Sequence, residues 1–187
     1  MLSTHPEVAS RMIEELRRVV GGNENHVSWD HIQDLPYCGA VFNESLRLFP
    51  PVSANFRICN ETCTLPSGLT LPKGCRVALP ISAIGRDPKL WDRPEEFLPE
   101  RWLDKEDPSK PVRRPDEFIL PFFWGGPRIC LGKDMARLEV ISTAHTILTS
   151  GLRFHVLPQQ NEKIKIGPVQ FYECGVLVKL SQQETIC

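Results

Sequence analysis

The sequence lacks the features that mark several large classes of protein. Its 187 residues contain no internal repeats. They also contain no run of about 18 apolar residues, which a membrane-spanning helix needs. The first residues show no signal-peptide hydrophobic segment, and the formal net charge of -1 leaves no basic excess for binding nucleic acid. We therefore expect this chain alone to be soluble and to have no polyanionic partner.

Metal-binding cysteine pairs are missing as well. The seven cysteines form no Cys-x-x-Cys pair, and no histidines stand at zinc-finger spacing. Cys59 and Cys63 are compatible with a metal clip or a disulfide, but ordinary thiols between a loop and a strand explain them more simply. A reduced, cytosol-facing environment fits such a scattered set.

The composition is that of a globular chain. A hydrophobic content of 41% and a charged content of 24% fit one domain, or one piece of a larger domain. Seventeen prolines, clustered between Pro50 and Pro127, predict long ordered loops between few regular elements. The predicted fold class is mainly α with small antiparallel β-sheets (α+β), and residues 1–187 are expected to form a single partial domain.

Hydrophobic periodicity predicts three long helices. The first follows a capping box with Thr4 as N-cap and ends at Gly21, and the second runs from about Leu35 to Phe49. The third is expected to be buried and to run from about residue 133 to residue 149. Alternating extended pieces and turns predict a small antiparallel sheet over 52–84 and a C-terminal hairpin system with strands at 153–156, 163–166 and 176–180. Residues 104–116 are expected to form a solvated charged loop.

The stretch that most clearly indicates a functional site surrounds Cys130. Glycines at 125, 126 and 132 let the backbone turn tightly and come close to a bulky partner. A predicted helix begins directly after the cysteine, and a helix N-terminus favours a thiolate through its N–H groups and its dipole. From the residues alone, Cys130 is either a nucleophile or an axial metal ligand.

Three motifs in one order resemble the cytochrome P450 haem-thiolate monooxygenases, and they resemble the C-terminal portion of that family. They are Glu44-x-x-Arg47, then Phe97-Leu98-Pro99-Glu100-Arg101-Trp102, then Phe123-x-x-Gly126-x-Arg128-x-Cys130-x-Gly132. The third motif fixes the residue type at five positions and is therefore the specific one. The residues around Pro50-Pro51 and around Cys130 most resemble those of the fatty-acid ω-hydroxylase branch.

The resemblance implies the roles of the site residues. Cys130 is expected to be the catalytic thiolate ligand of haem b (iron protoporphyrin IX), with Phe123 packed near the sulfur and N–H donors at the following helix start. Arg128 and Arg57 would hold the haem propionates. Gly126 and Gly132 belong to the same cofactor-binding loop.

Glu44, Arg47 and Arg101 resemble the buried Glu-Arg-Arg triad of the family, whose role is structural. The same Glu-x-x-Arg spacing recurs at Glu14 and Glu15, where we interpret it as a solvated helix face.

The resemblance also implies partners and a location. Electrons would come from NADPH through NADPH–cytochrome P450 reductase, and O2 and a lipophilic small molecule would be the substrates. Residues 52–56 and 170–174 are expected to contact the substrate. A full-length parent would lie on the cytosolic face of the endoplasmic reticulum membrane, attached through an N-terminal part that the resemblance does not cover.

Three functions remain open at this point. The first is oxygen insertion into a C–H bond, possibly hydroxylation of a long-chain fatty acid. The second is a truncated, non-catalytic haem-binding or structural remnant, because the distal oxygen-activating half of the family has no counterpart here. The third is a cysteine nucleophile, which would need a histidine base such as His145 or His155.

Overall fold

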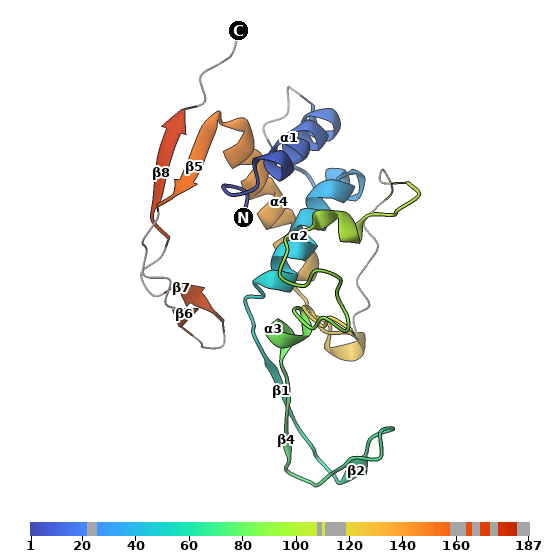
Figure 1. Ribbon diagram of the computed structural model, residues 1–187. Coiled ribbons are helices and arrows are strands. Elements are labelled where there is room, and N and C mark those ends of the chain that lie inside the picture. The colour runs from blue at the N-terminus through green and yellow to red at the C-terminus, as the bar shows by residue number, and fades with distance from the viewer. Residues whose placement is uncertain are drawn as a thin grey trace.

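Three helices form the body of the protein. The computed structural model describes residues 1–21, 26–107, 110, 119–157, 164–165, 169–172 and 176–182. The long helices are α1 (Pro6–Val20), α2 (Pro36–Leu48) and α4 (Lys133–Thr149), and each contacts the other two (Figure 1). Shorter helical segments join them: η1 (Asp30–Asp34), α3 (Ile81–Ile84), η2 (Pro99–Trp102) and η3 (Gly126–Arg128). Within the described ranges, no helix has both the length and the apolar character needed to cross a membrane.

The hydrophobic core lies where the three long helices meet. Leu16 of α1, Cys38 of α2 and Ile141 of α4 have almost no exposed surface. Full burial of an aliphatic side chain contributes about 1.5–3 kcal/mol to folding, so this junction holds the body together. Phe97 and Trp102 extend the core towards η2.

The first helix begins differently from the prediction. Its N-cap is His5, which makes no side-chain capping bond. The Thr4 hydroxyl donates to the carbonyl of Met1 at 2.8 Å instead, so the predicted capping box is wrong. The predicted end is correct, because Gly21 takes a φ of 77° at the C-cap.

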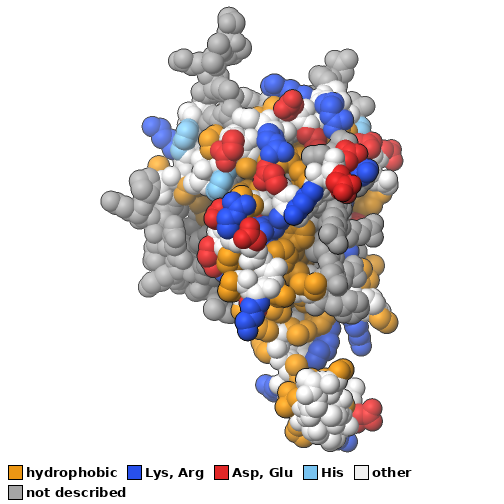
Figure 2. Space-filling view, turned by 45° about the vertical axis from the view of Figure 1, so that its right-hand side comes forward, with side chains coloured by type: hydrophobic (Ala, Val, Ile, Leu, Met, Phe, Trp, Pro, Cys, Tyr) orange, Lys and Arg blue, Asp and Glu red, His pale blue; other side chains and the backbone are white. Residues whose placement is uncertain are grey.

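Residues 55–79, which we call the arm, contain four short strands. β1 (Asn55–Ile58) pairs with β4 (Arg76–Leu79), and β2 (Cys63–Thr64) pairs with β3 (Thr70–Leu71), both antiparallel. The arm therefore has two two-stranded sheets where the sequence predicted one. Figure 1 shows β1 and β4 running away from the helices, with β2 near the far end, and in Figure 2 that end projects as a separate knob.

The C-terminal region also consists of antiparallel strand pairs, as predicted. β5 (Leu152–Val156) pairs with β8 (Val178–Gln182), and β6 (Ile164–Lys165) pairs with β7 (Phe171–Tyr172). Most of the predicted charged loop at 104–116 lies outside the described residues, but Asp104 is exposed as expected. Helices with small antiparallel sheets confirm the predicted α+β class.

Helix α4 has the predicted bounds but not the predicted burial. Only Ile141 and His145 are buried in it, whereas Met135 is 63% exposed and Val140 is 50% exposed. The reason is that α1 and α2 cover one side of α4 and leave its other side open. The expectation of a buried helix is therefore wrong, and this open side adjoins the cysteine loop.

Candidate functional site

The residues that precede α4 form a closed loop, which we call the cysteine loop (residues 121–132). Its ends are joined where the Cys130 N–H donates to the Phe123 carbonyl at 2.7 Å. Between them, Trp124 and Gly126 adopt left-handed φ values of 60° and 61°, which reverse the chain. The 3-10 turn η3 then leads back to Cys130. Cys130 is thus held by its backbone at the base of a tight loop.

The surface beside Cys130 is open. The cysteine is exposed, and the neighbouring Leu131 is fully exposed. A Cβ added at Gly126 or Gly132 would meet no atom within 4 Å. Packing inside this chain therefore does not require glycine at 132, where φ is an ordinary -88°. A large flat group has room to lie against this loop.

Phe123 connects the cysteine loop to the helical body. Its ring stacks on Phe42 of α2, with centroids 6.2 Å apart and an interplanar angle of 17°. Its carbonyl accepts the hydrogen bond from Cys130. Because α2 is fixed in the core, this pair of contacts sets the position of the loop. One of the N–H groups expected to donate to the Cys130 sulfur is already engaged, because the Lys133 N–H donates to the Cys130 carbonyl at 3.3 Å.

The two candidate propionate-binding arginines are placed differently. Arg57 leaves the arm and lies over the Trp124 ring of the cysteine loop, with its guanidinium carbon 3.7 Å from the centroid. Such a cation–π contact is worth about 0.5–1 kcal/mol at an exposed site. Arg128 is exposed in η3, two residues before Cys130. The sequence analysis missed Trp124, because it lies at a position that the motif leaves free.

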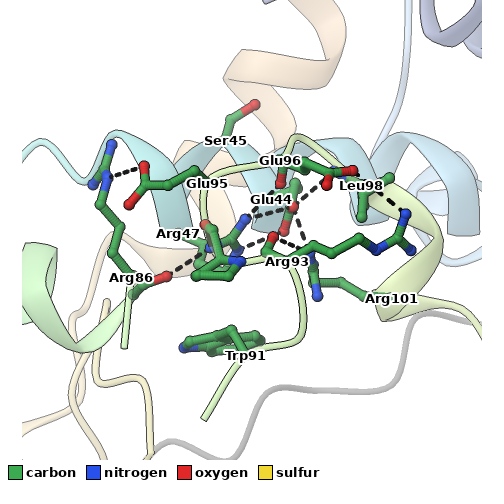
Figure 3. A network of polar contacts seen from close by, with 12 residues as sticks. Glu44, Ser45, Arg47, Arg86, Trp91, Arg93, Glu95, Glu96, Leu98 and Arg101 are labelled. Atoms are coloured by element: carbon green, nitrogen blue, oxygen red, sulfur yellow. Dashed lines mark hydrogen bonds and ion pairs between the residues drawn. The ribbon is translucent and has the colours of Figure 1, made fainter. Parts of the chain in front are cut away.

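A polar network with a buried centre joins Glu44, Arg47 and Arg101 (Figure 3). The Glu44 carboxylate receives hydrogen bonds from both nitrogens of one edge of the Arg47 guanidinium, at 2.8 and 2.9 Å. Arg101 Nε donates to the same carboxylate at 3.1 Å. The Leu98 N–H and the Trp102 indole N–H complete its shell, at 2.8 and 2.9 Å. The sequence motif did not reveal these last two donors.

Every N–H group of Arg47 has an acceptor. Besides Glu44, its guanidinium donates to the backbone carbonyls of Gly85, Pro94 and Glu96, at 2.6, 2.6 and 2.9 Å. Neither Arg47 nor Glu44 has exposed side-chain surface. Burial alone would raise the pKa of Glu44, but the hydrogen bonds and charge of Arg47, with the Leu98 and Trp102 donors, lower it below its ordinary value. The pair therefore stays ionised and ties the segment 85–102 to α2.

The two predicted substrate-contact segments approach each other. The Gln170 N–H donates to the Pro51 carbonyl at 2.6 Å, next to residues 52–56. Residues 173–174 of the second segment lie outside the described residues. Phe56 is exposed, while residues 52–55 are half-buried.

Neither histidine considered as a base for Cys130 is placed for that role. His145 is buried and lies twelve residues into α4, which is about 18 Å at 1.5 Å per residue. His155 Nε2 pairs with the Ser181 hydroxyl at 3.0 Å. In the described part of the chain, no three or more His, Cys, Asp or Glu side chains are arranged to hold a metal ion. The cysteine loop presents one exposed cysteine side chain, that of Cys130.

The described residues thus combine a helical body, small antiparallel sheets and an exposed cysteine on a glycine-containing loop directly before a helix. A sequence model of the cytochrome P450 family matches residues 1–180. The chain belongs to the cytochrome P450 family, and the resemblance found in the sequence is thereby confirmed.

Individual relatives agree with this assignment. Cytochrome P450 4A10 of Rattus norvegicus is 39% identical over 158 residues, which are 84% of this chain and 29% of the relative. Cytochrome P450 94C1 of Arabidopsis thaliana is 36% identical over 174 residues, which are 90% of this chain and 34% of the relative. The chain thus spans about a third of the length of these relatives.

A solved structure shows the same arrangement. The retinoic acid bound cyanobacterial CYP120A1 superposes with a TM-score of 0.79 at 32% identity, over 97% of this chain and 40% of that protein. The predicted fold, the C-terminal part of the cytochrome P450 fold, is confirmed by this match.

Proposed function

We propose that the chain is the haem-binding C-terminal portion of a cytochrome P450 monooxygenase, with Cys130 as the haem ligand. In this function one oxygen atom of O2 is inserted into a C–H bond of a lipophilic substrate. The observation that carries the proposal is the exposed Cys130, held by its backbone beside open space in front of α4.

The residues present fit a haem. Cys130 offers one sulfur, and the open glycine positions leave room for a flat macrocycle. Exposed Ile129 and Leu131 give an apolar surface on which such a group can lie. Arg57 and Arg128 come from the arm and from the cysteine loop, and both are exposed cations suited to propionates.

The protein residues would act by positioning and by tuning the sulfur. A haem with a thiolate ligand supplies the chemistry of O–O bond cleavage. The Phe123 carbonyl fixes the Cys130 backbone, and the Lys133 N–H is already bonded to a carbonyl. The N–H groups of Leu131 and Gly132 are therefore the donors that we assign to the sulfur. The stack of Arg57 on Trp124 holds its guanidinium against the same loop.

The remaining components follow from family membership and from the sequence motifs. We propose electron transfer from NADPH through a reductase, and a lipophilic substrate, with a long-chain fatty acid favoured by the motifs around Pro50-Pro51. Residues 52–56 and Gln170, which lie together, would line its path. For a full-length parent we propose the cytosolic face of the endoplasmic reticulum membrane.

A second candidate is a non-catalytic haem-binding or structural remnant. The observation in its favour is the exposure of Cys130 and Leu131, because a haem on this face would meet solvent. Water at that position favours loss of the cofactor and side reactions over oxygen insertion.

The test is the absorption spectrum of the 187-residue chain after addition of haem, reduction and exposure to CO. The proposal predicts the red-shifted Soret band of a thiolate-ligated haem. Cys130→Ala should abolish this band, and Cys63→Ala, which removes an exposed cysteine outside the loop, should leave it unchanged.

Two further results separate the candidates. A chain that takes up no haem would overturn haem binding and leave the structural role. A chain that shows the thiolate band but gives no NADPH-dependent hydroxylation of a long-chain fatty acid, with a reductase present, would favour the passive binder.

A further inference from the structure

Trp124 of the cysteine loop adopts a backbone conformation that strains a residue with a side chain. Its φ of 60° lies in the left-handed region, which glycine enters freely and other residues enter at a cost. Strain of this kind is kept mainly at functional sites, where the surrounding contacts hold it in place. The contacts of Trp124 should therefore explain why the loop carries an indole at a position that glycine would fill more easily.

Backbone hydrogen bonds do not provide that explanation. The Trp124 N–H reaches the Pro121 carbonyl only at 3.5 Å, and within the described residues the Trp124 carbonyl accepts no hydrogen bond. Arg93 differs, although its φ of 46° is also left-handed, because its carbonyl accepts bonds from the Glu96 N–H and from Arg101, at 3.2 and 3.3 Å. The main chain thus offsets the strain at Arg93, whereas at Trp124 the side chain is the part that makes the close contact.

The indole ring of Trp124 carries the guanidinium of Arg57. The guanidinium carbon lies 3.7 Å from the ring centroid, which is the shortest cation–π contact among the described residues. Tryptophan is the aromatic residue that attracts a cation most strongly. Trp124 is half-buried, and Arg57, which comes from β1, is exposed. The stack therefore joins the arm to the loop that holds Cys130 and keeps a cation there.

Arg57 is restrained in position but has no counter-charge. Its Nη1 donates to the Phe56 carbonyl at 2.9 Å, and its guanidinium lies over the ring of Trp124. Within the described ranges, no carboxylate pairs with it. A guanidinium has five N–H donors in a planar fork that matches a carboxylate. A side chain already fixed in place loses less freedom on binding an anion, so the stack favours carboxylate binding.

We propose that Trp124 is a positioning residue for the carboxylates of the cofactor: its ring holds Arg57 ready for a haem propionate, and the left-handed strain is tolerated in exchange. The proposal rests on the haem-binding function argued above. It deepens that function, because it assigns carboxylate recognition to a pair of residues from two separate segments. It also implies that the loop would be less strained with glycine at 124 but would recognise the propionates less well.

The first experiment compares two ligands that differ only in their carboxylates. Haem and haem dimethyl ester, whose carboxylates are blocked, are titrated into the 187-residue chain, and the dissociation constants are read from the Soret absorbance. Trp124→Gly should weaken haem binding by about two- to five-fold, the size of an exposed cation–π contact, and leave the ester unchanged. Trp124→Phe should keep most of the haem affinity, because a phenyl ring also stacks on a guanidinium.

A double variant tests whether Trp124 acts through Arg57. In Arg57→Gln, which has no guanidinium to position, Trp124→Gly should not change the haem affinity further. Trp29→Ala is the control, since it removes an exposed indole outside the cysteine loop, and it should leave both affinities as in the parent.

Urea unfolding of the chain without haem tests the strain directly. Trp124→Gly and Trp124→Ala both remove the indole, but only glycine enters the left-handed region freely, so Trp124→Gly should have the higher urea midpoint. Both variants should show the same loss of haem affinity. A lower midpoint for Trp124→Gly than for Trp124→Ala would overturn the strain argument, whether or not the chain binds haem.

The outcomes separate this proposal from the proposed function. It is overturned if Trp124→Gly weakens haem and its ester equally, which would indicate a merely structural role, or if it weakens neither. It is also overturned if the effect persists in Arg57→Gln. Each of these results leaves haem ligation by Cys130 intact, because that is read from the thiolate band of the parent. A parent that takes up neither ligand would overturn both proposals.

Discussion

Arg47 and Gly85 meet where the structure has no room for another side chain. Arg47 Nη1 donates to the Gly85 carbonyl at 2.6 Å. A Cβ built on Gly85 would overlap the backbone carbonyl oxygen of Arg47. Gly85 has a φ of -64°, which any residue can adopt, so space and not backbone conformation demands glycine here.

We predict that Gly85→Ala destabilises the protein by about 1–3 kcal/mol, because the added methyl group must push α3 away from α2 and stretch the Arg47 bonds. The measurement is the free energy of unfolding in urea. Gly132→Ala is the matched control, since a Cβ there meets no atom within 4 Å and φ is negative. Equal losses in the two variants would contradict the steric explanation.

Glu44→Gln should destabilise the protein by about 3–5 kcal/mol, because it leaves the guanidinium of Arg47 buried without its counter-charge. The control is Glu95→Gln, which breaks an ion pair to Arg86 in which the glutamate is 72% exposed. An exposed pair is worth about 0–1 kcal/mol, so this variant should unfold close to the parent. Similar unfolding energies for both variants would show that the network is not a structural support.

The same carboxylate predicts how acid affects stability. The folded pKa of Glu44 lies below its ordinary value of 4.5, so its contribution is present above that pH and is lost as the pH falls through the folded pKa. The parent should therefore lose more unfolding free energy between about pH 5 and about pH 3 than Glu44→Gln does. Parallel pH profiles for the two proteins would contradict this assignment.

The sequence predicted the structural role of Glu44 but missed that of Glu15. Its Glu-x-x-Arg spacing suggested a solvated face, yet its carboxylate is buried and accepts the N–H groups of Tyr37 and Cys38, at 2.9 and 2.8 Å. Tyr37 and Cys38 follow Pro36 in the first turn of α2. Backbone N–H groups in a first turn have no acceptor within their own helix, and Glu15 supplies one. The spacing around Glu15 describes only its own helix, and its partners lie more than twenty residues away.

Sequence patterns describe local structure only, which also explains the other differences between the predicted and the observed fold. The bounds of α4 follow from local periodicity and from Gly151, and they were predictable. The open side of α4 depends on which neighbours cover it, and periodicity does not carry that information. Likewise, the turn residues predicted strands in the arm, but a glycine bulge at Gly74, where φ is 81°, is a feature of strand pairing, and it splits the predicted sheet in two.

Glu15→Ala should lower the unfolding free energy by about 1–2 kcal/mol, because two N–H groups at the start of α2 lose their acceptor. Glu14→Ala is the control, since that neighbouring side chain is exposed, and we expect a change within about 0.5 kcal/mol. Urea unfolding of both variants at neutral pH makes the comparison. A neutral effect of Glu15→Ala would mean that water replaces the carboxylate as the cap.

His145 predicts a second, separate loss of stability at mildly acid pH. Its ring is buried on the core side of α4, and among the residues that the structure describes its Nδ1 has no hydrogen-bond partner. Burial lowers its pKa below the ordinary 6.5, with smaller contributions from His26 and His31. Just below pH 6.5, His145 therefore binds a proton in the unfolded chain but not in the folded chain. Stability is present above that pH and falls as the pH drops towards the folded pKa.

His145→Leu should remove this slope, because leucine fills a similar volume and has no nitrogen to protonate. Between about pH 7 and about pH 5 the parent should lose unfolding free energy, while His145→Leu should stay nearly level. His155→Gln changes an exposed histidine of β5 and should keep the slope of the parent. If His145→Leu keeps the full slope, the acid sensitivity in this range comes from another group, and the buried ring of α4 is not its source.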